Sequence, residues 1–164
     1  MARRPFAAGR TAALVAILAA GLAGCGYSLG LGARLKGGAE AVEVRPFEND
    51  SVDPALGAEV TAALREALAR RGVPGGAASR GVLSGTARTE SAPPSMAAGA
   101  VLRVVLEVKA RLVVDGVQVA ERTVRREADH LGGADALEGE ARRAQALHRL
   151  AAEVARELVI ALED

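Results

Sequence analysis

The sequence predicts an α+β fold, a two-layer sandwich with two helices on one face of a roughly four-stranded, mainly antiparallel sheet in the order βαβββα. Two observations carry this prediction. Residues 101–114 alternate apolar and polar side chains and lead into a hairpin turn, which is typical of a strand with one buried face. Residues 54–70 and 137–162 instead repeat apolar side chains at steps of three and four, which is typical of helices with one buried stripe.

The first strand and the first helix lie between residues 40 and 72. Val42 and Val44 alternate with charged residues up to Pro46, so we expect a short strand here. Asp53 precedes Pro54, a pair that favours an N-cap followed by the first helical residue. The apolar stripe of the expected helix consists of Leu56, Val60, Leu64 and Leu68. A basic last turn at Arg70 and Arg71 and a stop at Gly72 end it.

The middle of the chain predicts three strands. Residues 80–89 form a weaker alternating pattern, which the pair Pro93-Pro94 terminates. The stretch 101–114 follows, and Asp115-Gly116 is a type I′ turn signal. Residues 117–126 then return as the antiparallel partner, so we expect a long hairpin with one buried face.

The last element is a long helix. Asp135 is placed to cap it, and Glu138 follows three residues later, as in a capping box. We expect the helix to continue to the end of the apolar stripe at Leu162.

Composition excludes several classes of function. The 164 residues fit one domain. With 21 Lys and Arg against 20 Asp and Glu, no Trp, two Phe and one Tyr, the chain has neither the basic charge nor the aromatic platforms of a nucleic-acid binder. One Cys and two His cannot build the usual zinc site. No nucleophile, phosphate loop or carboxylate pair has catalytic spacing, so we expect no cofactor, no metal and no enzymatic activity.

The N-terminus predicts a secretion signal and a lipid anchor. Arg3, Arg4 and Arg10 precede an apolar segment at residues 12–22, which is too short to span a bilayer. The sequence Leu22-Ala23-Gly24-Cys25 resembles the bacterial lipobox. We therefore expect a signal peptide at 1–24, acyl chains on Cys25, a flexible tether at 25–38 and a periplasmic domain at 39–164. By the same resemblance, Gly26 in place of Asp implies the outer membrane. The alternative is an ordinary signal peptide followed by a free or buried Cys.

A basic cluster on the expected hairpin is the one constellation that suggests binding. With a two-residue turn and regular pairing, Lys109 would face Arg122, and like charges in that arrangement favour a bound anion. The hypothesis assigns the binding of phosphate groups to four residues: Arg103, Lys109, Arg111 and Arg122. The alternatives are a solvated outer face, or a bulge near Ala120 that moves Glu121 beside Lys109.

Several motifs together resemble the LptE family of lipopolysaccharide-assembly lipoproteins. They are Cys25-Gly26-Tyr27, Val42-x-Val44-x-Pro46-Phe47-Glu48-Asn49, Pro93-Pro94, the long hairpin, and Ala146-Leu147-x-x-Leu150-Ala151 in the last helix. The resemblance implies a partner of the LptD β-barrel in the outer membrane that helps the barrel assemble and binds lipopolysaccharide. Ala128-Asp129 departs from the family pattern, where an aromatic residue is expected before the Asp.

Two other functions remain open from the sequence. An outer-membrane lipoprotein that scaffolds or activates a periplasmic cell-wall enzyme would have the same signal, tether and small domain. A periplasmic binder of a small ligand would need a deep apolar pocket. The identity of the bound partner distinguishes these hypotheses, because the LptE hypothesis predicts a large β-barrel and the scaffold hypothesis predicts a cell-wall enzyme.

Overall fold

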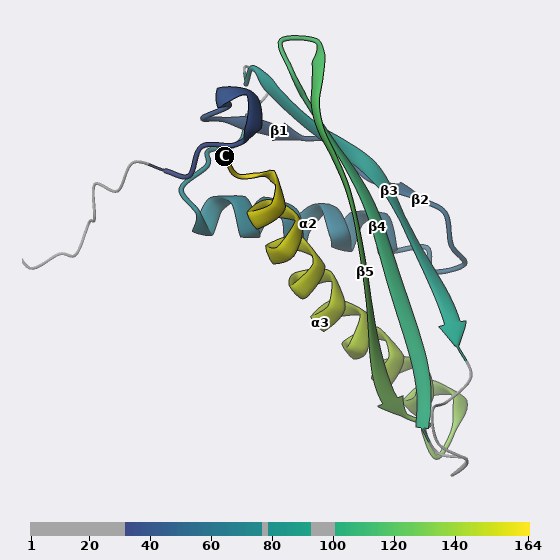
Figure 1. Cartoon of the computed structure of the whole chain (residues 1–164). Coiled ribbons are helices and arrows are strands. Elements are labelled where there is room, and N and C mark those ends of the chain that lie inside the picture. Colours follow the sequence, from purple (N-terminus) through teal and green to yellow (C-terminus); the bar gives the residue numbers. More distant parts are fainter. Residues whose placement is uncertain (1–31, 77–78, 93–100) are drawn as a thin grey trace, which may run out of the picture. The chain divides into compact units, whose positions relative to one another are not determined.

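The sheet has five strands and mixed pairing (Figure 1). Strand order is β1-β3-β4-β5, with β2 also paired to β3. The strands β1 and β2 run parallel to β3, whereas β3, β4 and β5 are antiparallel. Their bounds are β1 Val42–Val44, β2 Glu48–Asn49, β3 Gly81–Ala92, β4 Val101–Val114 and β5 Val117–Leu131. The α+β prediction is confirmed, with one strand more than expected because β2 has only two residues and no alternating pattern.

The computed structural model describes residues 32–76, 79–92 and 101–164. Residues 32–164 form one compact unit. The predicted signal peptide, Cys25, the tether as far as residue 31 and the pair Pro93-Pro94 lie outside the described residues.

Helix α2, Leu56–Arg70, packs its predicted stripe into the core. Leu56, Val60, Leu64 and Leu68 are all buried. The predicted cap at Asp53 is wrong, because the N-cap residue is Ala55 and has no side-chain cap. The carboxylate of Asp53 instead accepts hydrogen bonds from residues of β3 and α3.

Helix α3, Ala136–Leu162, begins at the predicted cap. Oδ1 of Asp135 accepts a hydrogen bond from the backbone N–H of Glu138 at 2.8 Å. The Glu138 carboxylate accepts in return from the N–H of Ala134 at 2.6 Å. The bond to Asp135 is that of a capping box, whereas the Glu138 carboxylate binds the N–H of Ala134, one residue before the N-cap.

The hairpin of β4 and β5 turns at Asp115 and Gly116, whose φ angles are 50° and 82°. Positive φ at both central residues is the signature of the predicted type I′ turn. The strand β5 extends to Leu131, five residues further than predicted. It therefore includes His130, which is buried on the sheet and not in a polar turn.

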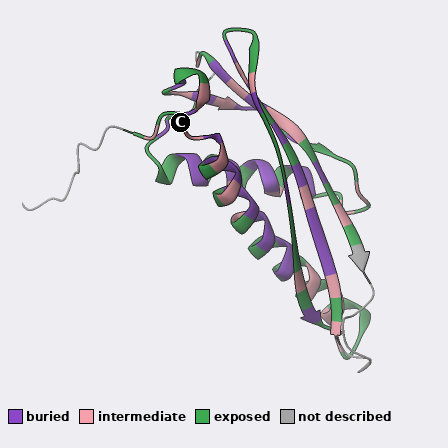
Figure 2. Cartoon of the chain, in the orientation of Figure 1, coloured by how far each residue is buried: buried purple, intermediate pink, exposed green. Residues whose placement is uncertain are grey.

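The core lies between the helices and one face of the sheet, here called the inner face (Figure 2). Alternate residues of β4 fill it, namely Val104, Leu106, Val108, Ala110, Leu112 and Val114. The opposite face is called the outer face.

The expected tether through residue 38 is too long. The side chain of Leu35 is fully buried, and its N–H donates to the carbonyl of Ala39 at 3.0 Å. A short 3-10 helix, η1, follows at Lys36–Gly38. Burial of the Leu35 side chain and a hydrogen bond from the N–H of Ala33 to the carbonyl of Arg71 at 2.9 Å hold this part of the chain against the domain.

Candidate functional site

The pairing of β4 with β5 decides which basic side chains share a face. Val113 pairs with Gln118, but Leu112 pairs with Ala120, so Val119 is an extra residue on β5. This β-bulge shifts the register by one for the rest of the hairpin. The predicted pairing of Lys109 with Arg122 is therefore wrong, and Lys109 lies opposite Thr123.

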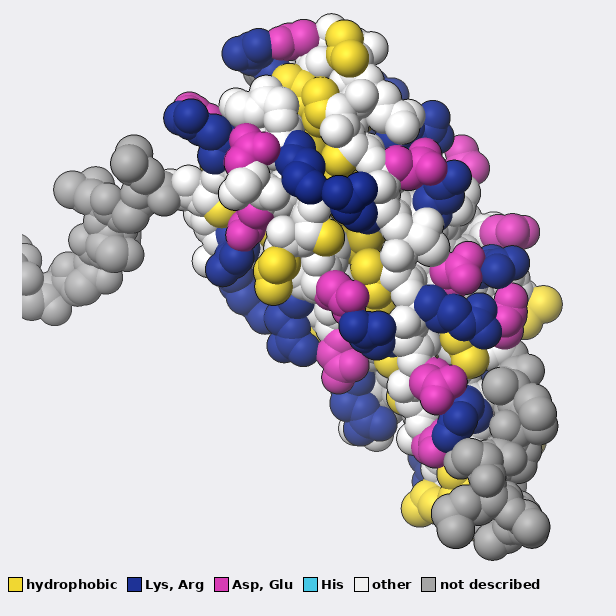
Figure 3. All heavy atoms as spheres, in the orientation of Figure 1, with side chains coloured by type: hydrophobic (Ala, Val, Ile, Leu, Met, Phe, Trp, Pro, Cys, Tyr) yellow, Lys and Arg dark blue, Asp and Glu magenta, His cyan; other side chains and the backbone are white. Residues whose placement is uncertain are grey.

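A closed network of ion pairs covers the centre of the outer face. Arg88 contacts Glu107 at 3.1 Å and Glu90 at 3.4 Å. Arg125 contacts the same two carboxylates at 3.5 Å and 3.1 Å. The hydrogen bond from Arg88 lowers the pKa of Glu107. Val105 is only 2% exposed although it lies on the outer face, where Glu90 and Glu127 are its partners on the neighbouring strands. Basic and acidic side chains accordingly intermingle over the strands (Figure 3).

Two of the four predicted binding residues are held in ion pairs on this face. Nε of Arg103 lies 2.7 Å from Oδ1 of Asp129, and its NH1 lies 3.1 Å from Glu127. The hydrogen bond from Arg103 lowers the pKa of Asp129. Nζ of Lys109 lies 3.0 Å from Oε1 of Glu121. The bulge alternative thus describes the hairpin correctly, since it brings Glu121 beside Lys109.

The other two predicted residues lie on opposite faces of the sheet. Arg111 is on the outer face opposite Glu121 and forms no ion pair with any residue that the structure describes. Arg122 pairs with Ala110 and so lies on the inner face. Its NH1 donates to the backbone carbonyl of Glu121 at 2.8 Å. The four residues therefore do not form one cluster.

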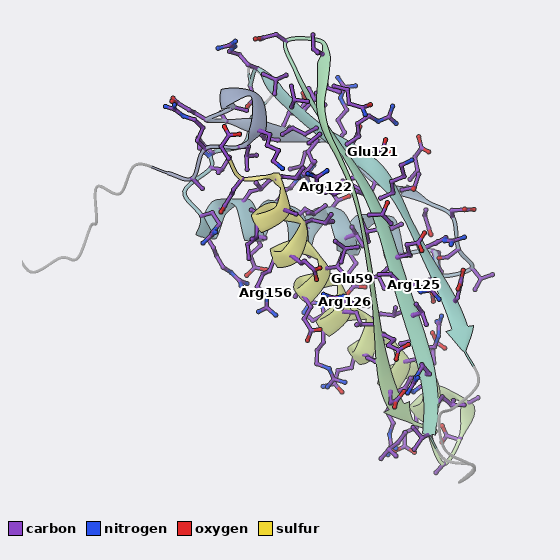
Figure 4. The ribbon with its side chains drawn as sticks, in the orientation of Figure 1. Glu59, Glu121, Arg122, Arg125, Arg126 and Arg156 are labelled. Atoms are coloured by element: carbon purple, nitrogen blue, oxygen red, sulfur yellow. The ribbon has the colours of Figure 1, made fainter. Side chains whose placement is uncertain are left out.

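In place of the predicted four-residue cluster, the structure has a basic region along the margin between β5 and α3. It contains Arg122 and Arg126 (Figure 4). Figure 4 shows Arg122 and Arg126 on the α3 side of β5, with Glu121 and Arg125 on the other side. Arg126 forms an ion pair with Glu157 of α3.

Lys36 of η1 contacts the C-terminal end of α3. Its Nζ donates to the carbonyl of Ala161 at 3.2 Å. This contact places a positive charge at the C-terminal end of α3, where the helix dipole favours one. Sequence reasoning missed the contacts of Lys36 and Arg126 with α3, because both join residues that are distant in the sequence.

The two histidines lie on different elements, His148 on α3 and His130 on β5. Nδ1 of His148 lies 2.8 Å from Oε1 of Glu59, on the exposed surface between α3 and α2. His130 is buried near the end of β5. Within residues 32–76, 79–92 and 101–164, no group of three side chains could hold a metal ion. No helix in these ranges is both long and apolar enough to cross a bilayer.

The fold defines a class of small domains in which two helices cover a mixed sheet. A putative lipoprotein from Caulobacter crescentus superimposes with a TM-score of 0.54 at 19% identity, covering 75% of this chain and 88% of that chain. Rare lipoprotein B from Shewanella oneidensis gives 0.53 at 18% identity, with 70% and 91% coverage. The PelC dodecamer from Paraburkholderia phytofirmans gives 0.53 at 19% identity, with 81% and 95% coverage. At these identities the solved structures establish a shared fold.

Within this class, the chain belongs to the LptE family, described as lipopolysaccharide-assembly, whose family model matches residues 39–162. The match spans the strands β1 to β5 and the whole of helices α2 and α3. This is a family of non-enzymatic lipoproteins. A search of curated proteins finds no match.

Proposed function

We propose that this protein is an outer-membrane lipoprotein that partners an LptD-type β-barrel in assembling lipopolysaccharide at the cell surface. The family match over residues 39–162 is the observation that carries this proposal. Many charged side chains on the outer face of the sheet form ion pairs with one another. Such a surface suits a protein that acts by contact with a partner.

The proposal includes a lipid anchor at Cys25. The lipobox-like sequence ends seven residues before Gly32, where the described domain begins. Acyl chains on Cys25 would hold the domain at the membrane, because each buried methylene contributes about 0.8 kcal/mol.

The proposal includes direct binding of lipopolysaccharide, through fewer residues than the four that the sequence predicts. A phosphate group needs a cation that is not already neutralised by a carboxylate. Arg103 and Lys109 would have to leave their ion pairs to bind one, whereas Arg111 and Arg122 have no carboxylate partner among the described residues. We therefore assign two separate phosphate contacts, one to Arg111 on the outer face and one to Arg122 on the inner face.

Depletion of the protein in its own bacterium tests the role. Newly made lipopolysaccharide at the cell surface and folded LptD-type barrel should both fall, and expression of the wild-type chain should restore both. A defect confined to cell-wall synthesis, with normal surface lipopolysaccharide, would contradict the proposal and favour the scaffold of a cell-wall enzyme.

A further inference from the structure

A groove of about 780 Å³ runs along the edge of the sheet at β1. The residues Val42–Val44 form one wall, and the end of α2 with the loop at residues 72–76 forms the other. The strand β1 is an end strand of the sheet order, with β3 on its other side. An edge strand of this kind presents backbone groups that can pair with another chain.

The direction of each backbone group of β1 follows from its pairing with β3. The N–H of Arg45 donates to the carbonyl of Leu83 at 2.9 Å. Because N–H and C=O groups alternate sides along a strand, those of Glu43 face β3 as well. The groups of Val42 and Val44 therefore face the groove.

Two of these four groups already have partners. The N–H of Val42 donates to the carbonyl of Pro74 at 3.0 Å, and the carbonyl of Val44 accepts from NH2 of Arg65 at 2.9 Å. The carbonyl of Val42 and the N–H of Val44 have no hydrogen-bond partner within the described part of the chain. The groove thus contains one free acceptor and one free donor, two residues apart on the same strand edge.

We propose that this edge binds an extended, acidic segment of a partner polypeptide, which joins the sheet as a strand beside β1. In a parallel ladder, one residue of the incoming strand donates to Val42 and accepts from Val44, so it uses both free groups at once. In an antiparallel ladder, the carbonyl of Val42 and the N–H of Val44 would instead pair with two residues of the incoming strand, on either side of the one opposite Glu43.

The preference for an acidic segment comes from the side chains around the groove. Arg45 and Arg65 line it, and Glu43 is its one carboxylate. Arg45 has no ion pair with any residue described. A carboxylate on the incoming strand would therefore gain a charge-assisted contact.

Glycines leave the second wall open. A Cβ at Gly75 would lie 3.5 Å from the carbonyl oxygen of Val42, and Gly75 has no positive φ. A larger side chain at this position can therefore fit the fold while it covers the free acceptor.

The test uses the full-length, isotope-labelled protein in detergent micelles and a capped peptide of alternating valine and glutamate. The amide resonance of Val44 should shift on titration, and its hydrogen exchange should slow. Gly75→Val and Arg45→Glu should each weaken binding by about fivefold or more. Arg149→Glu, on the exposed side of α3 and outside the groove, is the matched charge control and should leave the affinity unchanged.

Three results would overturn the inference. The first is an unchanged Val44 amide at millimolar peptide. The second is equal binding of the peptide with lysine in place of glutamate. The third is a Val44 shift that depends on protein concentration alone, since a second copy would then occupy the edge. The inference needs neither lipidation nor a barrel partner, so it can fail while the proposed function stands.

Discussion

Asp53 and Arg143, 90 residues apart in the sequence, form a two-point ion pair between the segment before α2 and the first half of α3. NH2 of Arg143 lies 2.7 Å from Oδ2 of Asp53. The same oxygen accepts from the hydroxyl of Thr89 on β3 at 2.8 Å. Both charged side chains are less than one-fifth exposed. One carboxylate thus joins both helical segments to the sheet.

Removal of this pair should destabilise the fold. Arg143→Ala leaves the Asp53 carboxylate partly buried without its cation, so we expect a loss of about 2 kcal/mol in the free energy of unfolding. Urea denaturation measures it. Arg149→Ala on the exposed side of α3 is the control, with an expected change within about 0.5 kcal/mol. Equal effects of the two substitutions would contradict the assignment.

The contribution of Asp53 should depend on pH. The hydrogen bond from Arg143 lowers the pKa of Asp53 in the folded protein. Its stabilisation is therefore fully present above the ordinary carboxyl pKa of about 4 and is lost as pH falls through the lowered folded value. The difference in unfolding free energy between wild type and Asp53→Asn should be constant from pH 7 to about 5 and shrink below about 4. A difference that stays constant to the lowest accessible pH would contradict this account.

The burial of a residue on the inner face of β4 should determine whether the fold tolerates a charged side chain at that position. Leu106 is fully buried, whereas Leu102, on the same face, is 47% exposed. Leu106→Asp buries an unpaired carboxylate and should cost more than about 4 kcal/mol, enough to unfold the domain. Leu102→Asp should remain folded by circular dichroism. Folding of both variants would argue against the inner face as the core.

The two classes of basic residue should differ in lipopolysaccharide binding. Arg111→Ala combined with Arg122→Ala removes the two cations without carboxylate partners, and we expect an affinity loss of about tenfold. Arg103→Ala combined with Lys109→Ala removes cations that are already paired, and should change the affinity by less than about threefold. Binding of purified lipopolysaccharide to each protein measures both, with melting temperature as the check on folding. The reverse order of effects would refute the assignment.

Cys25→Ala should separate membrane attachment from folding. Loss of the acyl chains removes the anchor, so we expect the cleaved variant in the soluble periplasmic fraction. Its melting temperature should match that of the wild-type protein. A cleaved variant that stays with the membrane would rule out Cys25 as the anchor.

Local patterns predict the regular elements of this fold well. The bounds of β4, the turn at Asp115-Gly116 and the cap at Asp135 follow from nearby residues, and the structure confirms all three. The position of Asp53 could not be predicted in this way. Its partner Arg143 is distant in the sequence, and an ion pair outcompetes the N-cap for the carboxylate.

The basic hairpin was predicted only in part. The strands and their charges follow from the sequence, and a bulge near Ala120 is one of the alternatives that it leaves open, but the pattern does not decide between this bulge and regular pairing. One unpaired residue then moves Arg122 to the inner face and brings Glu121 to Lys109. A shift of the register by one residue changes which basic side chains share a face of the sheet. The membership of such a cluster therefore depends on the exact strand pairing.

Purification of the tagged protein from its own outer membrane in gentle detergent tests the central claim most directly. The account predicts a large β-barrel of the LptD type in one-to-one stoichiometry with the tagged chain. Recovery of a cell-wall enzyme, with no barrel, would contradict it.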